Sequence, residues 1–355
     1  MALAAISLAL LLFSGAALQR LGLRRSWRIG SGVPQASGGG ALATASAAAE
    51  ALAAAAAAAK AQAARSDYLL AALEPLLQRD GNDVMAIERV VDLLVLAGSL
   101  SGKGGSGGAG ARARPRLVQI GANDAGASAN DPIFNRLRAS EAEALEAVLV
   151  EPVPHLFEAM AASYANLTRA RRGLSIRPLW AAACPPGSGA TRLFYSFRAN
   201  ASAYFFTNTR TGMREAFKPH VQQLGSFRLG HLAHTSHATE ADLAPALLLT
   251  HVPCTDLQKI MCEQRWAPGS LDYLHIDAEG FDFAVVQASS LAATRPRVIR
   301  LEAQHIAADE CEAFLTELGY RVIRFNANGV NEMLAILTRP GASRSSAPLN
   351  CSAAA

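Results

Sequence analysis

Two short segments hold most of the residues whose types and spacing could do chemistry. Residues 117–126 read LVQIGANDAG, and residues 274–282 read LHIDAEGFD. In each, an apolar run ends in a cluster of Gly, Asn, Asp or Glu, as in a buried parallel strand that delivers polar residues at its carboxyl end. Because ligands of open α/β sheets bind in the crevice at those ends, we expect the two segments to meet at one site.

The first segment provides candidate cofactor-binding residues, namely Gly121, Asn123, Asp124 and Gly126. Glycine allows a tight turn and close approach of a ligand, and backbone amides at the start of the next helix can receive polar ligand atoms. No Lys-Ser or Lys-Thr follows Gly126, which excludes a P-loop, and Asn123 replaces the second glycine of the dinucleotide pattern. That glycine admits a pyrophosphate, so a ligand with adenosine but no pyrophosphate is compatible.

Glu151 ends the next expected strand, in the sequence AVLVEPVP. A carboxylate in this position can accept hydrogen bonds from both hydroxyls of a ribose. The structural alternative is a solvated acid at a strand end. The combination of a glycine-rich turn with a strand-end Glu favours the ribose-binding interpretation.

The second segment crowds Asp277, Glu279 and Asp282 at the end of one strand. Like charges that share a desolvated pocket raise at least one pKa, and such a carboxylate can act as a general base. The candidate catalytic residues are Asp277, Glu279 and His305, in that order; His305 follows a further strand. Three alternatives stay open: Glu279 caps a helix, His305 is a surface histidine, or the carboxylates hold Mg²⁺, although no spacing demands a metal.

The elements that must position these residues form an α/β pattern between residues 112 and 340. Apolar strand candidates alternate with helical patterns, the first of which spans about 131–147. This alternation predicts a mostly parallel central sheet with helices on both faces. The expected strands are 117–121, 147–151, 175–182, 271–277, 298–302, 320–325 and 333–337.

The region before this domain predicts a targeting segment followed by an extension. Residues 1–30 contain an apolar run and then several arginines, which fits a signal peptide, a membrane anchor or an organellar transit peptide. Residues 31–65 are a low-complexity Ala, Gly and Ser segment, 66–97 a helical hairpin, and 98–111 a Gly/Ser linker. The tail at 341–355 is expected to be disordered.

Three glycosylation sequons, at Asn166, Asn200 and Asn350, favour the secretory pathway, Golgi or membrane. A plastid or mitochondrion stays the alternative, and association with a membrane would occur through the N-terminus. The charge is only +4 over 355 residues. Basic residues are not interleaved with aromatics, so binding to nucleic acid is not favoured.

Five cysteines show no zinc spacing, and we expect small buried residues. A disulfide between Cys254 and Cys262 stays possible in a secretory protein. Residues 190–250 are rich in aromatics and histidine, including His231, His234 and His237. Their spacing matches no zinc site that we can justify, so we expect a substrate loop or lid with solvated histidines.

Four segments together resemble the FkbM family of S-adenosylmethionine-dependent methyltransferases, in order and in spacing, over roughly residues 116–338. They read VQIGAND (118–124), VEPVPHLF (150–157), VPCT (252–255) and HIDAEGF (275–281). The resemblance implies a Rossmann-like methyltransferase fold and O-methylation, often of sugars or natural products.

The resemblance also implies roles for individual residues. Gly121, Asn123 and Gly126 would line the methionine part of S-adenosylmethionine, Glu151 would bind its ribose, and Ala182 with its neighbour would lie near the adenine. One departure is Ala125, where many relatives have Gly, so that an extra Cβ could narrow the turn. Residues 225–227 would face the substrate.

The leading hypothesis is therefore an S-adenosylmethionine-dependent O-methyltransferase that acts on a hydroxyl of a glycan or small metabolite. A rival from another class is a non-catalytic, membrane-tethered interaction protein that keeps the methyltransferase fold. A third hypothesis, an NAD-dependent enzyme, is disfavoured by the missing second glycine.

Overall fold

The computed structural model describes residues 67, 71, 114–125, 131–139, 145–171, 173–185, 187–327, 329–338, 349 and 351. The predictions for residues 1–30, 31–65 and 98–111 lie outside these residues, as does nearly all of the 66–97 hairpin and the 341–355 tail. Within the described part of the chain, no helix has the length and apolarity needed to cross a membrane.

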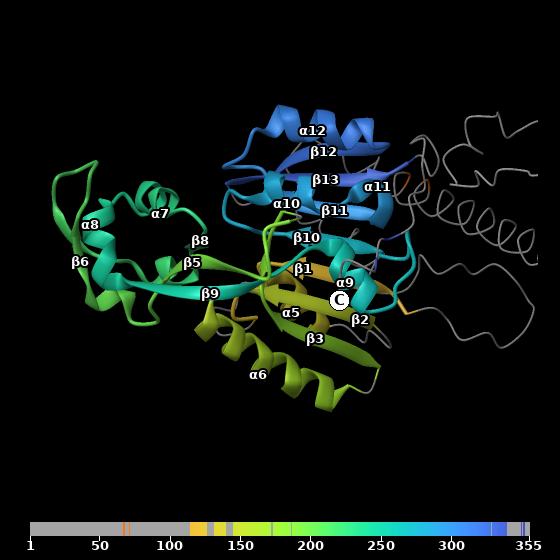
Figure 1. Cartoon of the computed structure of the whole chain (residues 1–355), viewed down its shortest axis with the longest axis horizontal. Helices are drawn as coiled ribbons and strands as arrows, with labels where there is room; N and C mark the ends of the chain where they lie inside the picture. The colour runs from red at the N-terminus through yellow and green to blue at the C-terminus, as the bar shows by residue number, and fades with distance from the viewer. Residues whose placement is uncertain are drawn as a thin grey trace, which may run out of the picture. The chain divides into compact units, whose positions relative to one another are not determined.

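A seven-stranded sheet forms the centre of the domain, in the order β12-β13-β11-β10-β1-β2-β3 (Figure 1). The strands from β11 to β3 run parallel, whereas β13 is antiparallel to both of its neighbours. All seven predicted strands are present. They are β1 (Arg116–Ile120), β2 (Leu145–Glu151), β3 (Leu174–Trp180), β10 (Tyr273–Ile276), β11 (Val298–Glu302), β12 (Tyr320–Ala327) and β13 (Val330–Leu337).

Helices cover both faces of this sheet, as predicted for a Rossmann-like fold. Alternate residues of each strand point to opposite faces: Leu117 packs in one core with α5 and α6, and Val118 in another core with α9 to α12. The helices are α5 (Pro132–Ala139), α6 (Pro154–Ala170), α9 (Leu257–Glu263), α10 (Asp282–Ala288), α11 (Leu291–Thr294) and α12 (Ala308–Glu317). The predicted helix over 131–147 is too long, because residues 145–147 pair in β2.

Residues 182–255 form a subdomain beside the main sheet (Figure 1). Its long antiparallel pair, β5 with β9, is extended by β8 and β4, while β6 and β7 form a separate hairpin. A core around Phe197, Phe217 and Leu232 holds these pieces together, so this segment is a folded subdomain and the expectation of a loop is wrong. The elements are β4 (Ala182–Ala183), β5 (Thr191–Phe197), η1 (Ala201–Ala203), β6 (Phe205–Thr207), β7 (Arg214–Ala216), η2 (Pro219–Gln223), β8 (Gly225–Ser226), α7 (Leu229–Ser236), α8 (Glu240–Leu243), η3 (Ala244–Ala246) and β9 (Leu247–Thr255).

The structure contains two disulfides, and neither is the Cys254–Cys262 bond that the sequence left possible. Cys184 pairs with Cys254, and Cys262 pairs with Cys351, so the Cys254–Cys262 pairing is wrong. The cause is strand pairing: β4 lies parallel to the end of β9, which places residue 184 next to Cys254. Cys311 is free and buried, and of the five cysteines it alone matches the expectation of a small buried residue without a disulfide.

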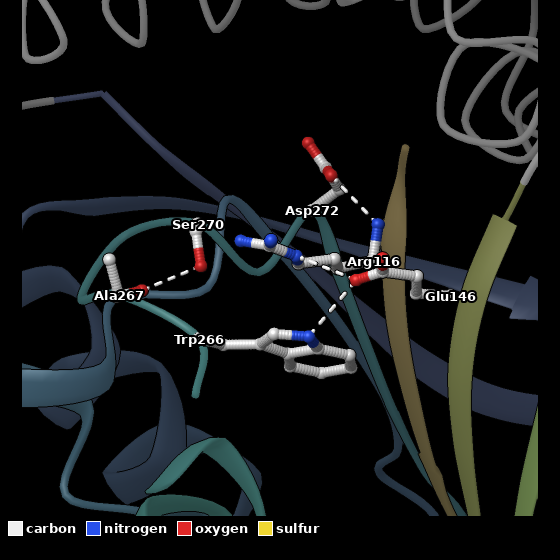
Figure 2. Close-up of polar contacts among 6 residues, drawn as sticks. All are labelled: Arg116, Glu146, Trp266, Ala267, Ser270 and Asp272. Atoms are coloured by element: carbon white, nitrogen blue, oxygen red, sulfur yellow. Dashed lines mark hydrogen bonds and ion pairs between the residues drawn. The ribbon is translucent and has the colours of Figure 1, made fainter. Parts of the chain in front are cut away.

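A polar network fixes the amino ends of β1, β2 and β10 (Figure 2). The Glu146 carboxylate accepts hydrogen bonds from Arg116 Nε and Trp266 Nε1, both at 3.1 Å. The backbone N–H of Arg116 donates to Asp272 Oδ2 at 2.9 Å. These bonds join the amino ends of three neighbouring strands. The polar residues that end or follow β1, β2 and β10 lie at the opposite, carboxyl ends of the same strands.

Candidate active site

A pocket lies at the carboxyl ends of β1, β2 and β10, and it is lined by residues from both chemistry-bearing segments. Gly121, Glu151, Asp277 and Glu279 share its wall. The expected meeting of the two segments is therefore present in the structure. Its other walls are mostly apolar. They come from the end of β1, the end of β2 and the residues after it, the subdomain, and the turn after β10 with α10: Ile120, Val150, Pro152, Val153, Ala182, Ala183, Phe194, Gln223, Gly225, Ser226, Phe227, Ala278, Phe281 and Val285.

Gly121 is required by the packing of the site as well as lining it. Its φ is +78°, and a Cβ there would lie 1.8 Å from the backbone oxygen of Asp277. No side chain can be accommodated at that distance. Glycine therefore lets the turn after β1 and the turn after β10 approach each other closely enough to form one pocket.

Glu151 has a fixed orientation at the end of β2. Its Oε2 accepts from the backbone N–H of Asn123, and its Oε1 accepts from that of Val153, both at 2.8 Å. The side chain is only 4% exposed. Burial raises its pKa to about 7, against the lowering effect of the two amides. Each carboxylate oxygen has a second lone pair, so the group can accept further hydrogen bonds from a ligand.

The remaining predicted cofactor residues divide into three groups. Ala182 lines the pocket together with its neighbour Ala183. Asn123 and Asp124 are not among the lining residues; Asn123 contributes through its backbone N–H, which orients Glu151. Gly126 lies outside the described residues.

Ala125, the departure from the family pattern, adopts a left-handed conformation with φ +60° and is fully buried. Its methyl group packs in the core that contains α5 and α6. A left-handed residue other than glycine carries backbone strain of about 1–2 kcal/mol, so glycine would be the less strained residue here.

Asp277 and Glu279 bring two carboxylates to the pocket, whereas Asp282 has a structural position. Asp282 is fully buried, and it accepts hydrogen bonds from the backbone N–H groups of Ala278 (3.0 Å) and Gly280 (3.1 Å). It therefore holds the turn that presents Glu279, whose own φ is +50°. The alternative that Glu279 caps the following helix is wrong, because the N-cap residue of α10 is Phe281 and no side chain makes a capping hydrogen bond there.

The electrostatics of the turn favour protonated carboxyl groups near neutral pH. Asp277 is accessible from the cleft, yet the surrounding protein desolvates it and, with the charge of Glu302, raises its pKa to about 7. Desolvation, and then the charge of Asp277, raise the pKa of Glu279 to about 8. A group with a pKa close to the operating pH can both take up and release a proton.

His305, the third candidate catalytic residue, does not line this pocket. It is exposed and lines an adjacent groove with His231. The sequence gives no sign that His231 lies near His305, because no local pattern shows that α7 packs beside Gly280. Residues 225–227, which the resemblance implies to face the substrate, do line the pocket. Phe194 also lines it and was not predicted individually, although the segment is rich in aromatic residues. Within the described part of the chain, no cluster of three or more His, Cys, Asp or Glu is arranged to hold a metal ion.

The fold and the pocket define an open α/β protein whose ligand site lies where two strand-end turns meet. The family comparison is specific: a model of the methyltransferase FkbM domain matches residues 119–322. The chain belongs to this family and carries a methyltransferase domain. No curated protein matches the chain.

Solved structures show low similarity in sequence. The human methyltransferase 10 domain containing protein is 11% identical, with a TM-score of 0.34, over 77% of this chain and 96% of that one. Methyltransferase FkbM from Methylobacillus flagellatus KT is 9% identical, with a TM-score of 0.34, over 77% and 60% of the two chains. An uncharacterized protein from Listeria monocytogenes serotype 4b is 10% identical, with a TM-score of 0.29, over 65% and 63%. The chain thus spans less than two thirds of the last two structures.

Proposed function

We propose that this methyltransferase uses S-adenosylmethionine and methylates a hydroxyl oxygen of a glycan or small metabolite. The observation that carries the proposal is the pocket in which Glu151, oriented by two backbone amides, faces the same space as Asp277 and Glu279. In this proposal Glu151 binds the ribose of the cofactor, and Asp277 and Glu279 handle a proton.

The residues present fit this cofactor. The Glu151 carboxylate keeps free lone pairs for the two ribose hydroxyls. Ala182, Ala183 and Phe194 give the pocket an apolar wall against which a flat base would pack. Gly225 packs directly against the Phe194 ring, since a Cβ at residue 225 would lie 2.5 Å from that ring. The position of the ring in the pocket wall therefore depends on glycine at residue 225. When bound, S-adenosylmethionine supplies an electrophilic methyl group on a sulfonium, which needs no pyrophosphate-binding glycine.

The chain's own residues would then manage the acceptor. As the acceptor oxygen bonds to the methyl carbon and the carbon–sulfur bond breaks, the hydroxyl proton must leave. Asp277 is the first candidate to take it, because it is accessible from the cleft, and Glu279 is the second. A positioned carboxylate contributes about 10²–10⁴-fold in such a step, and alignment of the two reactants contributes separately.

Calorimetry on the full chain tests the cofactor. S-adenosylmethionine should bind to the folded protein, and Glu151→Ala should weaken that binding by tenfold or more, since a carboxylate hydrogen bond contributes about 1.5–3 kcal/mol. Asp277→Asn should lower turnover with labelled S-adenosylmethionine while it leaves cofactor affinity within a factor of about two. Absence of binding to a well-folded sample would refute the proposal and favour the rival, a non-catalytic interaction protein.

We further propose the secretory pathway as the compartment. Two disulfides support it, because disulfides persist in oxidising compartments, and the sequon residues Asn166 and Asn200 are exposed. Protein isolated from its native cells should carry both disulfides by peptide mapping under non-reducing conditions. Recovery of four alkylatable thiols from Cys184, Cys254, Cys262 and Cys351 would contradict the compartment.

A further inference from the structure

A second hollow adjoins the candidate active site and has a different character. It lies between the start of α7, the turn at Gly280 and Phe281, and the segment after β11. Phe281 lines both this groove and the pocket that holds Glu279. The two hollows are therefore neighbours that share the Phe281 wall, and an acceptor that passes this ring would contact both.

The groove is lined by basic side chains and by no Asp or Glu. Arg228, His231 and His305 face it from two separate elements. Glu240 approaches Gly230 at the groove's border but does not line it. Within the described residues, no carboxylate pairs with the Arg228 guanidinium, which lies over the Phe281 ring at 5.7 Å. The Arg228 guanidinium therefore brings positive charge to the groove, and no carboxylate among the lining residues offsets it.

The geometry around Gly280 is built tightly enough to hold the two histidines in place. A Cβ on Gly280 would lie 2.9 Å from His231 Cε1 and 3.2 Å from His305 Cβ. The His231 ring also packs edge-on to Phe281, with centroids 5.7 Å apart. Burial lowers the pKa of His231, and the charges of His305, His234 and Arg228 lower it further, against a hydrogen bond to the Glu279 backbone. An anion bound in the groove would favour the charged form of His231 and so raise its pKa.

We propose that this groove is an anion-binding subsite, and that the methyl acceptor carries a carboxylate, sulfate or phosphate group which Arg228, His231 and His305 bind. The inference rests on the proposed function, because it places the acceptor's hydroxyl at Asp277 and Glu279. The shared chemistry is an oxyanion near a reactive hydroxyl, as in a uronic acid or a sulfated or phosphorylated sugar. Charge-assisted hydrogen bonds from guanidinium and imidazolium to such groups are strong and specific.

The test is a titration of the full chain, followed through the ring resonances of its eight histidines by NMR at about pH 6.5. The probes are inorganic phosphate, inorganic sulfate, glucuronate and uncharged glucose. The three anions should shift the resonances of His231 and His305 (assigned with His231→Gln and His305→Gln) at least tenfold more strongly than glucose does. The strongest anion among the three identifies the source of the oxyanion.

A matched pair of variants locates the effect. Arg228→Gln should weaken anion binding by about tenfold or more, since one charge-assisted bond is lost. Arg214→Gln removes an arginine that makes the same kind of ring contact, over Phe205 at 5.6 Å, but lies outside the groove, so binding should not change. Unchanged His231 and His305 resonances with every anion, an equal response to glucose, or equal effects of the two variants would each overturn the proposal.

A second measurement distinguishes failure of the anion-binding proposal from failure of the proposed function. S-adenosylmethionine binding is measured on the same sample by calorimetry. If the cofactor binds and the anions do not, only the anionic acceptor is wrong. If the anions bind at the groove and the cofactor does not, the methyltransfer proposal is wrong and the acceptor assignment is lost with it.

Discussion

At the scale of single residues, the site is a cluster of carboxyl groups held in unfavourable surroundings. Glu151, Asp277 and Glu279 have pKa values raised to about 7, 7 and 8, with desolvation as the largest cause in each case. Such clusters lower stability at pH values where the groups ionise, and they are typical of functional sites. The structure therefore predicts a cost in stability that single substitutions can remove.

Glu279 gives the clearest case, and Glu279→Gln should stabilise the protein at high pH. The folded pKa of about 8 lies above the ordinary 4.5. The stabilising contribution of the protonated form is complete below pH 4.5 and disappears as the pH rises through 8. The neutral amide avoids that loss, so the variant should gain on the order of 2 kcal/mol at pH 9 and almost nothing at pH 4.

Urea unfolding of the variant and the parent chain at pH 4 and pH 9 measures this difference. Glu317→Gln is the control, because it makes the same chemical change at an exposed residue at the end of α12. A Glu279→Gln variant that is equally or less stable than the parent chain at pH 9 would show that the carboxyl is not desolvated.

At the scale of elements, the sequence predicted the strands of the main sheet because they are buried on both faces and therefore read as apolar runs. Residues 117–120 and 273–276 are all buried, and both precede polar turns. The subdomain was not predicted as a folded unit, because β6 and β8 have three and two residues. Strands that short carry no periodicity. In addition, β8 pairs with β5, which lies well before it in the sequence, whereas β6 pairs with the neighbouring β7.

Disulfide connectivity was unpredictable for the same reason. Cys184 and Cys254 are 70 residues apart, and only the parallel pairing of β4 with β9 brings them together. Gly121 and Glu151 were predictable as neighbours in one site, because they come at the ends of β1 and β2, in that order. Prediction of the groove would have required the position of α7 relative to the main sheet, and no local sequence pattern gives that position.

The Cys184–Cys254 disulfide connects β9 to the segment after Ala182 and Ala183, so its removal should affect both stability and the pocket. The double variant Cys184→Ala/Cys254→Ala should lose about 2–4 kcal/mol of unfolding free energy. It should also bind S-adenosylmethionine more weakly, because the wall formed by β4 is no longer fixed. Chemical unfolding and calorimetry on the oxidised protein give the two quantities.

The second disulfide provides the matched control. Cys262 and Cys351 join α9 to a residue near the C-terminus, and neither lines the pocket. The variant Cys262→Ala/Cys351→Ala should lose stability in the same range and keep cofactor affinity. Equal losses of affinity in both double variants would mean that the β4 wall has no special part in binding.

At the scale of the whole domain, the central strands have a structural hydrogen-bond network at one end and the candidate active site at the other. Amino ends are joined by the network of Arg116, Glu146, Trp266 and Asp272 (Figure 2), and carboxyl ends carry the pocket. Strand β2 reaches both, since Glu146 lies near its start and Glu151 at its end. Two residues of the same type on one strand therefore serve different ends of the molecule.

This separation predicts opposite outcomes for two substitutions on β2. Glu146→Ala removes the acceptor of the Arg116 and Trp266 bonds at 3.1 Å, and should lower the free energy of unfolding by about 1–2 kcal/mol without changing the dissociation constant of S-adenosylmethionine. Glu151→Ala should raise that constant by tenfold or more. Calorimetry and urea unfolding on both variants measure the pair. If Glu146→Ala weakens cofactor binding as much as Glu151→Ala does, the two ends of the sheet are coupled, and the pocket depends on strand alignment as a whole instead of on the carboxylate at its rim.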